Sequence, residues 1–229
     1  MTDLSAIRHI AFDADDTLWQ NEDFYRNTQA SFGQLLKPFI DPDETQKALD
    51  QTEARNMTLL GYGAKAMTMS LIETATQLVP DLPNSVVQQI LVLGKNLLRM
   101  PTNLLPGAYE TVTHCMRTRH VFIVTKGDLL EQERKFDQSP FKALGLDYIV
   151  LSGKEPSDYA KLLDRCGIRP DEFMMVGNSP RSDVLAPLEI GAYAVHVPYA
   201  LTWTHEHTSL APHPRMFVLK RIDELMALI

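Results

Sequence analysis

The sequence predicts an α/β protein with a doubly wound parallel sheet that is interrupted, after its first strand, by a set of helices. Three observations support this fold class. Short apolar runs alternate with helical patterns, which is typical of a parallel sheet covered by helices on both faces. The interval 19–101 contains helical patterns and no convincing strand. Three carboxylates, those of Asp13, Asp15 and Asp16, crowd the end of the first apolar run.

The predicted sheet is built from apolar runs that are short and continuous rather than alternating, as expected for strands buried on both faces. These runs are residues 7–12, 121–125, 148–151, 173–176 and 192–197. Helical patterns separate or follow them at residues 106–117, 129–138, 156–166, 182–190 and 222–229. Gly167 and Gly191 follow two of these patterns, at a position where glycine commonly ends a helix.

The interrupting interval is predicted to form four helices, at residues 24–39, 42–60, 64–79 and 85–100. The second of these begins with a capping aspartate, Asp41, followed by Pro42 at the first helical position. We therefore expect two domains. An α/β core is formed by residues 1–18 and 102–229, and an inserted helical domain is formed by residues 19–101.

Composition and charge exclude several classes of partner. The net charge of −7 disfavours nucleic acid, because phosphate binding needs a basic face. The two cysteines indicate no disulfide framework and favour a reducing compartment. We see no N-terminal basic segment followed by an apolar one, as a signal peptide has, and no apolar run long enough to cross a bilayer. We therefore expect a soluble cytoplasmic protein without membrane contacts. The sequence leaves the oligomeric state open, a homo-oligomer included.

The ends of the predicted strands carry the residues that point to chemistry, since ligands bind there in open parallel sheets. They are Asp13, Asp15 and Asp16, then Thr125 and Lys126, then Lys154, then Asn178 and Asp183. Each pair of like charges in the first group costs about 1 kcal/mol in water, and more where water is excluded, so a compensating cation is expected. Carboxylates bind Mg²⁺, and a hydroxyl, backbone N–H groups and a lysine can hold a phosphate. The set therefore suits phosphoryl transfer to an aspartate, with a second carboxylate as acid and base.

These residues resemble the four motifs of the haloacid dehalogenase-like hydrolase superfamily. The run 13–18 (Asp-Ala-Asp-Asp-Thr-Leu) resembles its first motif, DxDxT, and Thr125 after an apolar strand resembles the second. Lys154, with a proline shortly after it, resembles the third motif. Residues 177–183, with Gly-Asn-Ser and a later aspartate, resemble the fourth. The motifs stand in the right order, and the helical interval resembles the cap that many members insert between the first and second motifs.

The resemblance implies a role for each matching residue. Asp13 would be the nucleophile and a Mg²⁺ ligand, and Asp15 would be the general acid/base and bind Mg²⁺ through its backbone carbonyl. Thr125 would bind the phosphate with help from Lys126. Lys154 would balance the charge of Asp13 and the transferring phosphoryl group.

The fourth motif departs from the family pattern, and the resemblance does not say which of its residues would bind Mg²⁺ directly. Members often carry an aspartate directly after the glycine, where this chain has Asn178. An asparagine can supply a neutral oxygen to Mg²⁺, and Asp183 would then be the principal acidic ligand, directly or through water. Which of the two is the direct ligand stays open. Asp16 is expected to have a structural role.

The function implied is a Mg²⁺-dependent phosphatase that acts on a small phosphorylated metabolite of unspecified identity. A phosphomutase of the same superfamily is one alternative. A haloacid dehalogenase is another, although such members typically lack an aspartate at the position of Asp15. A phosphoacceptor receiver protein is the non-enzymatic alternative. Separately, His205, His207 and His213 lie in a loop whose spacing matches no closed zinc site, so we expect an exposed loop or the rim of an entrance there.

Overall fold

The structure is a computed structural model that describes residues 4–201 and 208–229. The chain divides into two compact units, each described here by itself. The α/β unit comprises Met1–Glu22, Thr102–Lys126 and Arg134–Ile229, and the helical unit comprises Asp23–Pro101 and Gly127–Glu133. Relative to the division expected from the sequence, residues 19–22 fall in the α/β unit and residues 127–133 fall in the helical unit.

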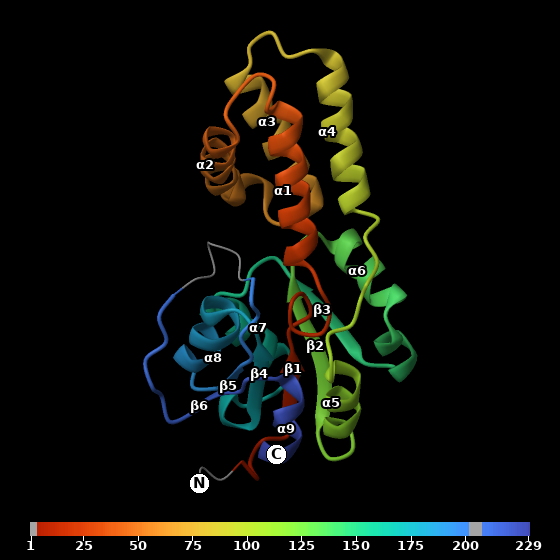
Figure 1. The fold of residues 1–229 in the computed structure, drawn as a ribbon. Coiled ribbons are helices and arrows are strands. Elements are labelled where there is room, and N and C mark those ends of the chain that lie inside the picture. The colour runs from red at the N-terminus through yellow and green to blue at the C-terminus, as the bar shows by residue number, and fades with distance from the viewer. Residues whose placement is uncertain (1–3, 202–207) are drawn as a thin grey trace. The chain divides into compact units, whose positions relative to one another are not determined.

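A parallel sheet forms the centre of the α/β unit (Figure 1). Its strands in the described part of the chain are β1 (His9–Phe12), β2 (His120–Lys126), β3 (Asp147–Leu151), β4 (Phe173–Gly177), β5 (Tyr193–His196) and β6 (Met216–Val218). The spatial order is β3-β2-β1-β4-β5-β6, and each neighbouring pair is parallel. The prediction of a doubly wound parallel sheet is confirmed, and β6 is an additional edge strand.

Helices cover both faces of this sheet because alternate strand residues point to opposite faces. Ile10 and Phe12 share a buried cluster with residues of α5 (Ala108–Cys115) and α9 (Leu225–Leu228). Ala11 faces the other way, into a cluster with residues of α7 (Pro156–Cys166) and α8 (Ala186–Glu189). Figure 1 shows these two helix layers on either side of the strands. β1 is therefore buried on both faces, as its continuous apolar run requires.

The expected helix at residues 182–190 is not one continuous α-helix. Residues Pro180–Leu185 form a π-helical turn, labelled η3, and α8 follows it. Ser179 caps the turn, since its hydroxyl accepts a hydrogen bond of 2.9 Å from the backbone N–H of Ser182. Such wide turns are often found at functional sites. The turn places Asp183 inside the unit, where its side chain is buried.

The helical unit is built mainly from α1 (Glu22–Leu36), α2 (Pro42–Leu60), α3 (Ala64–Leu78) and α4 (Asn84–Leu97), close to the predicted ranges. These helices surround an apolar core that includes Phe32, Leu36, Leu49, Met67, Leu71 and Ile90. Among the described residues, no helix combines the length and apolar character needed to cross a bilayer.

The first part of α6 (Leu129–Gln138) belongs to the helical unit. Glu131 explains this, because its carboxylate accepts a 2.8 Å bond from the backbone N–H of Ala64, the first residue of α3. The same carboxylate accepts a 3.2 Å bond from the hydroxyl of Tyr25 on α1. Glu131 thus supplies the N-terminal cap that the sequence of α3 lacks, since Gly63 precedes that helix.

We predict that Gly94→Ala destabilises the protein although Ala favours helices. A Cβ at position 94 on α4 would overlap the side chain of Thr68 on α3, whose hydroxyl is held by the carbonyl of Ala64 at 2.6 Å. Overpacking of this kind costs roughly 1–3 kcal/mol, which exceeds the helix-propensity gain. Thermal unfolding measures the effect. The matched control is Gly33→Ala on α1, where a Cβ would meet open space, so this variant should unfold at a higher temperature than the wild type. Equal unfolding midpoints for the two variants would contradict the close packing at Gly94.

Candidate active site

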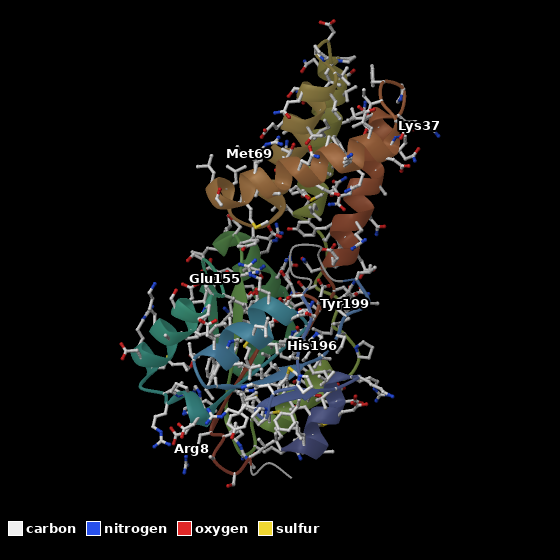
Figure 2. The ribbon with its side chains drawn as sticks, turned by 90° about the vertical axis from the view of Figure 1, so that its left-hand side faces the viewer. Arg8, Lys37, Met69, Glu155, His196 and Tyr199 are labelled. Atoms are coloured by element: carbon white, nitrogen blue, oxygen red, sulfur yellow. The ribbon has the colours of Figure 1, made fainter. Side chains whose placement is uncertain are left out.

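Asp13 lies directly after the central strand of the sheet, at the carboxyl ends of its neighbours. Phe12 is in register with Ile123 on β2 and with Val176 on β4. The backbone N–H of Asp13 donates to the carbonyl of Val176 at 2.8 Å, which extends the pairing by one step. In Figure 2, Glu155 marks this end of the α/β unit, and Arg8, which precedes β1, marks the opposite end.

Thr17 joins the loop after β1 to the loop after β4. Its hydroxyl lies 3.0 Å from Oδ2 of Asp13 and 3.2 Å from Oδ1 of Asn178, to either of which it can donate. The same hydroxyl accepts a 3.0 Å bond from the backbone N–H of Asn178. A carboxylate oxygen and an amide oxygen therefore converge on one hydroxyl. The structure thus brings Asp13 and Asn178 together, as the predicted metal site requires.

Lys154 lies between two buried carboxylates. Its Nζ forms an ion pair with Oδ1 of Asp13 and another, of 2.8 Å, with Oδ1 of Asp183. Burial opposes the charge of this lysine, but Asp13 and Asp183 raise its pKa well above the usual range, so the ammonium stays protonated. Burial and the charge of Asp183 raise the pKa of Asp13 to about 7, while Lys154 acts in the opposite direction.

Asp183 is fixed from two directions. Besides Lys154, its Oδ2 accepts a 3.0 Å bond from the backbone N–H of Ser179. A Cβ on Gly177 would overlap the Asp183 side chain, so only glycine at the end of β4 leaves room for it. Both carboxylate oxygens of Asp183 thus have hydrogen-bond donors. The amide oxygen of Asn178 and Oδ2 of Asp13 both lie near the single hydroxyl of Thr17, which can donate to one of them at a time.

Thr125 and Lys126 end β2, next to β1. Thr125 is buried, and its hydroxyl makes a long contact of 3.5 Å with the carbonyl oxygen of Lys126. The Lys126 ammonium donates to the hydroxyl of Ser182 in η3 at 2.9 Å. This contact joins the second and fourth predicted motifs. His196, labelled in Figure 2, adds a link from β5, because its Nε2 donates to the backbone carbonyl of Asn178 at 3.0 Å.

Asp15 is held by two side chains that sequence reasoning did not identify. Oδ1 accepts a 2.6 Å bond from the indole Nε1 of Trp19. The Nζ of Lys135 on α6 lies 3.0 Å from Oδ1 and 2.9 Å from Oδ2. Lys135 occupies an ordinary position in an amphipathic helix, so no local pattern distinguishes it from other helical lysines.

Asp16 has the structural position expected for it. Its φ of 61° is the single positive φ of a non-glycine residue in the described chain. The carboxylate accepts from the backbone N–H groups of Asn21 and Glu22, at 2.8 and 3.0 Å, where α1 begins. Burial, together with the charge of Asp15, raises the pKa of Asp16 to about 8.

The oxygen donors present fit Mg²⁺. The predicted ligands are the carboxylates of Asp13 and Asp183, the amide oxygen of Asn178 and the backbone carbonyl of Asp15, and hard oxygen donors of this kind suit the ion. Residues 4–201 and 208–229 contain no group of three or more His, Cys, Asp or Glu arranged to hold a metal, so the predicted site depends on two carboxylates and on neutral oxygens. His205 and His207 lie outside the described residues.

Comparison with known proteins gives a family and one close relative. A family model described as haloacid dehalogenase-like hydrolase matches residues 7–191. The chain is 35% identical to a haloacid dehalogenase-like family hydrolase from Xanthomonas campestris, over 97% of this chain and 90% of that one, with a TM-score of 0.89. No match was found among the curated proteins.

More distant solved structures share the fold. A predicted phosphoglycolate phosphatase from Haemophilus somnus is 15% identical over 99% of both chains, with a TM-score of 0.62. A 2-haloacid dehalogenase from Pseudomonas syringae is 15% identical over 97% of both chains, with a TM-score of 0.64. A putative hydrolase from Bacillus subtilis, determined with bound magnesium, is 14% identical over 97% of this chain and 98% of that one, with a TM-score of 0.65.

Proposed function

The chain belongs to the haloacid dehalogenase-like hydrolases, and on this premise we propose that it is a Mg²⁺-dependent phosphatase of small phosphomonoesters. Its structural neighbours include both a predicted phosphatase and a dehalogenase, so the family alone does not decide the reaction. The residues around Asp13 favour one of these two reactions.

The observation that carries the proposal is the second carboxylate, Asp15, two residues after the nucleophile and held by Trp19 and Lys135. Displacement of a halide needs no proton, because halide is a stable anion. Displacement of an alkoxide from a phosphomonoester does need one, and a carboxylate next to the nucleophile can deliver it. A fixed acid at Asp15 therefore favours phosphatase chemistry over dehalogenation.

The reaction then has two steps. A carboxylate oxygen of Asp13 attacks phosphorus, the bond from phosphorus to the alcohol oxygen breaks, and Asp15 gives its proton to the departing alkoxide. Water next attacks the phosphorus of the aspartyl-phosphate, Asp15 takes the proton of that water, and phosphate leaves as Asp13 is restored. Lys154 offsets the charge of Asp13 throughout, and Thr125 with Lys126 holds the phosphoryl oxygens.

Mg²⁺ would be held by Asp13, Asn178, Asp183 and the backbone carbonyl of Asp15. When bound, the ion offsets the repulsion between the nucleophile and an anionic phosphate. We assign Asn178 as the direct ligand of the fourth motif. Asp183 holds Lys154 and accepts from the backbone N–H of Ser179, whereas the amide oxygen of Asn178 lies close to the Thr17 hydroxyl, so Asp183 would act on the ion indirectly.

The proposal predicts metal-dependent hydrolysis of p-nitrophenyl phosphate. With Mg²⁺ we expect steady release of p-nitrophenolate, with EDTA we expect at least about a 10²-fold slower rate, and added Mg²⁺ should restore it. The same preparation is assayed for halide release from 2-chloropropionate. Halide release without phosphate release, or turnover unaffected by EDTA, would overturn the proposal. A screen of phosphorylated metabolites then identifies the substrate.

A further inference from the structure

Each of the two predicted catalytic carboxylates has its own lysine. Asp13 pairs with Lys154, as the motif predicts, and Asp15 pairs with Lys135, which belongs to none of the four motifs. Lys135 lies in the part of α6 that belongs to the α/β unit, as does the loop after β1. The second pair therefore lies within one compact unit.

The Lys135 ammonium is satisfied by three oxygen atoms. Two belong to Asp15, at 3.0 and 2.9 Å, and the third is Oδ1 of Asn21, at 2.8 Å. An ammonium has three protons to donate, and these contacts direct it toward Asp15 and Asn21. The Lys135 and Asp15 side chains are only 13% and 20% exposed, so solvent screens this pair less than an ordinary surface pair.

The opposite side of the Asp15 carboxylate is fixed as well. Trp19, which donates to Oδ1 at 2.6 Å, is wholly buried in the apolar core of the unit. Its backbone also pairs with the loop, since the carbonyl of Trp19 accepts from the N–H of Asp16 at 2.7 Å. Trp19 therefore anchors one oxygen, and Lys135 is the group that fixes the direction of the other.

We propose that Lys135 is a positioning residue that orients the Asp15 carboxylate for its two proton transfers. This inference rests on the proposed phosphatase function and adds to it a residue outside the family motifs. Removing Lys135 takes away the ammonium that contacts both oxygens of the carboxylate, so the orientation of the carboxylate is less restricted. A general acid or base that is misplaced loses much of the roughly 10²–10⁴-fold advantage that correct placement gives.

The test is a double-mutant cycle with p-nitrophenyl phosphate as substrate and Mg²⁺ present. Because p-nitrophenolate leaves without a proton, loss of Asp15 orientation affects the second step. For Lys135→Met we expect kcat to fall about 10-fold or more and KM to fall in proportion, so that kcat/KM changes less than about 2-fold, with a burst of p-nitrophenolate before a slow steady rate. In an Asp15→Asn background, adding Lys135→Met should change kcat by less than about 2-fold.

A second readout does not depend on activity. The chain has two tryptophans, Trp19 and Trp203, so its indole N–H spectrum contains two signals, which a Trp203→Phe variant assigns. Lys135→Met should shift the Trp19 signal because its acceptor moves. Lys161→Met is the matched control, since Lys161 is exposed on α7, on the other face of the sheet from Trp19, and its loss should leave both kcat and the Trp19 signal unchanged.

Four results would overturn the inference, and only the last of them also overturns the proposed function. An unchanged kcat, an unmoved Trp19 signal, or an equal loss in the wild-type and Asp15→Asn backgrounds would overturn the positioning role while leaving the phosphatase function intact. An inactive wild type would overturn the proposed function and this inference with it. If Lys135→Met does not fold, Lys135→Gln keeps a polar head group without the charge and serves in its place.

Discussion

Asp13→Asn is expected to reduce phosphatase turnover by about 10³-fold or more, because it removes the attacking oxygen anion while preserving the shape of the side chain. The variant should fold, since the amide oxygen can still accept from Thr17 and Lys154 keeps its ion pair with Asp183. The measurement is steady-state release of p-nitrophenolate with Mg²⁺, together with the mass of the acid-quenched enzyme. Only the wild type should carry a covalent phosphoryl group.

The matched control for this substitution is Asp147→Asn. Asp147 begins β3, at the opposite end of the sheet from the active site, and its side chain is 72% exposed. This variant should retain full activity and the same phosphoryl adduct. A turnover of Asp13→Asn within about 10-fold of the wild type would show that another residue receives the phosphoryl group.

Lys154→Met is expected to lower both activity and stability. The Lys154 side chain is 1% exposed and its ammonium pairs with Asp13 and Asp183, so its removal leaves two buried carboxylates without a counter-charge. Breaking a buried ion pair in this way typically costs about 3–5 kcal/mol. Denaturant unfolding in EDTA measures the loss without interference from a bound cation, and p-nitrophenyl phosphate hydrolysis with Mg²⁺ should fall by about 10²-fold or more.

A second substitution separates charge from packing in this variant. Adding Asp183→Asn to Lys154→Met removes one of the two stranded charges. We therefore expect the double variant to recover part of the lost unfolding free energy while staying inactive. If it is no more stable than Lys154→Met, the destabilisation comes from packing and the electrostatic explanation is wrong.

Elements whose ends are determined by local chemistry were predictable from the sequence. The bounds of α7, Pro156–Cys166, agree with the prediction because Pro156 starts the helix and Gly167, with a φ of 65°, ends it. The strands β1 to β5 were recognisable as apolar runs. The short strand β6 was missed because its three residues, Met216–Val218, pair on one side only, at the edge of the sheet.

Features that depend on contacts between distant residues were not predictable. The sequence pattern at residues 182–190 indicates a helix, but the structure has a π-helical turn at Pro180–Leu185, capped by Ser179, before α8 begins. Glu131 has no sequence signal that links it to Ala64. Lys135 likewise meets Asp15 only because α6 packs beside the loop after β1.

The motif residues show the same contrast. Their order along the chain predicted that they would follow neighbouring strands, and the structure places Asp13, Lys154, Asn178 and Asp183 in one connected set of contacts. The sequence did not reveal that Asp183 is committed to Lys154 and Ser179. The partners of Asp183 depend on the direction of its side chain, and the spacing of residues along the sequence does not determine that direction.

The position of β1 in the sheet has a consequence for the order of folding. β1 pairs with β2 and β4, so that His9 meets His120 and Phe173, both far along the chain. Closing such long loops is slow, whereas consecutive helices such as α2 and α3 can associate as soon as both exist. During synthesis the helices α1 to α4 can associate before β2 and β4, the partners of β1, have been made. Asp13, the proposed nucleophile, is therefore among the first residues made and among the last to acquire its surroundings.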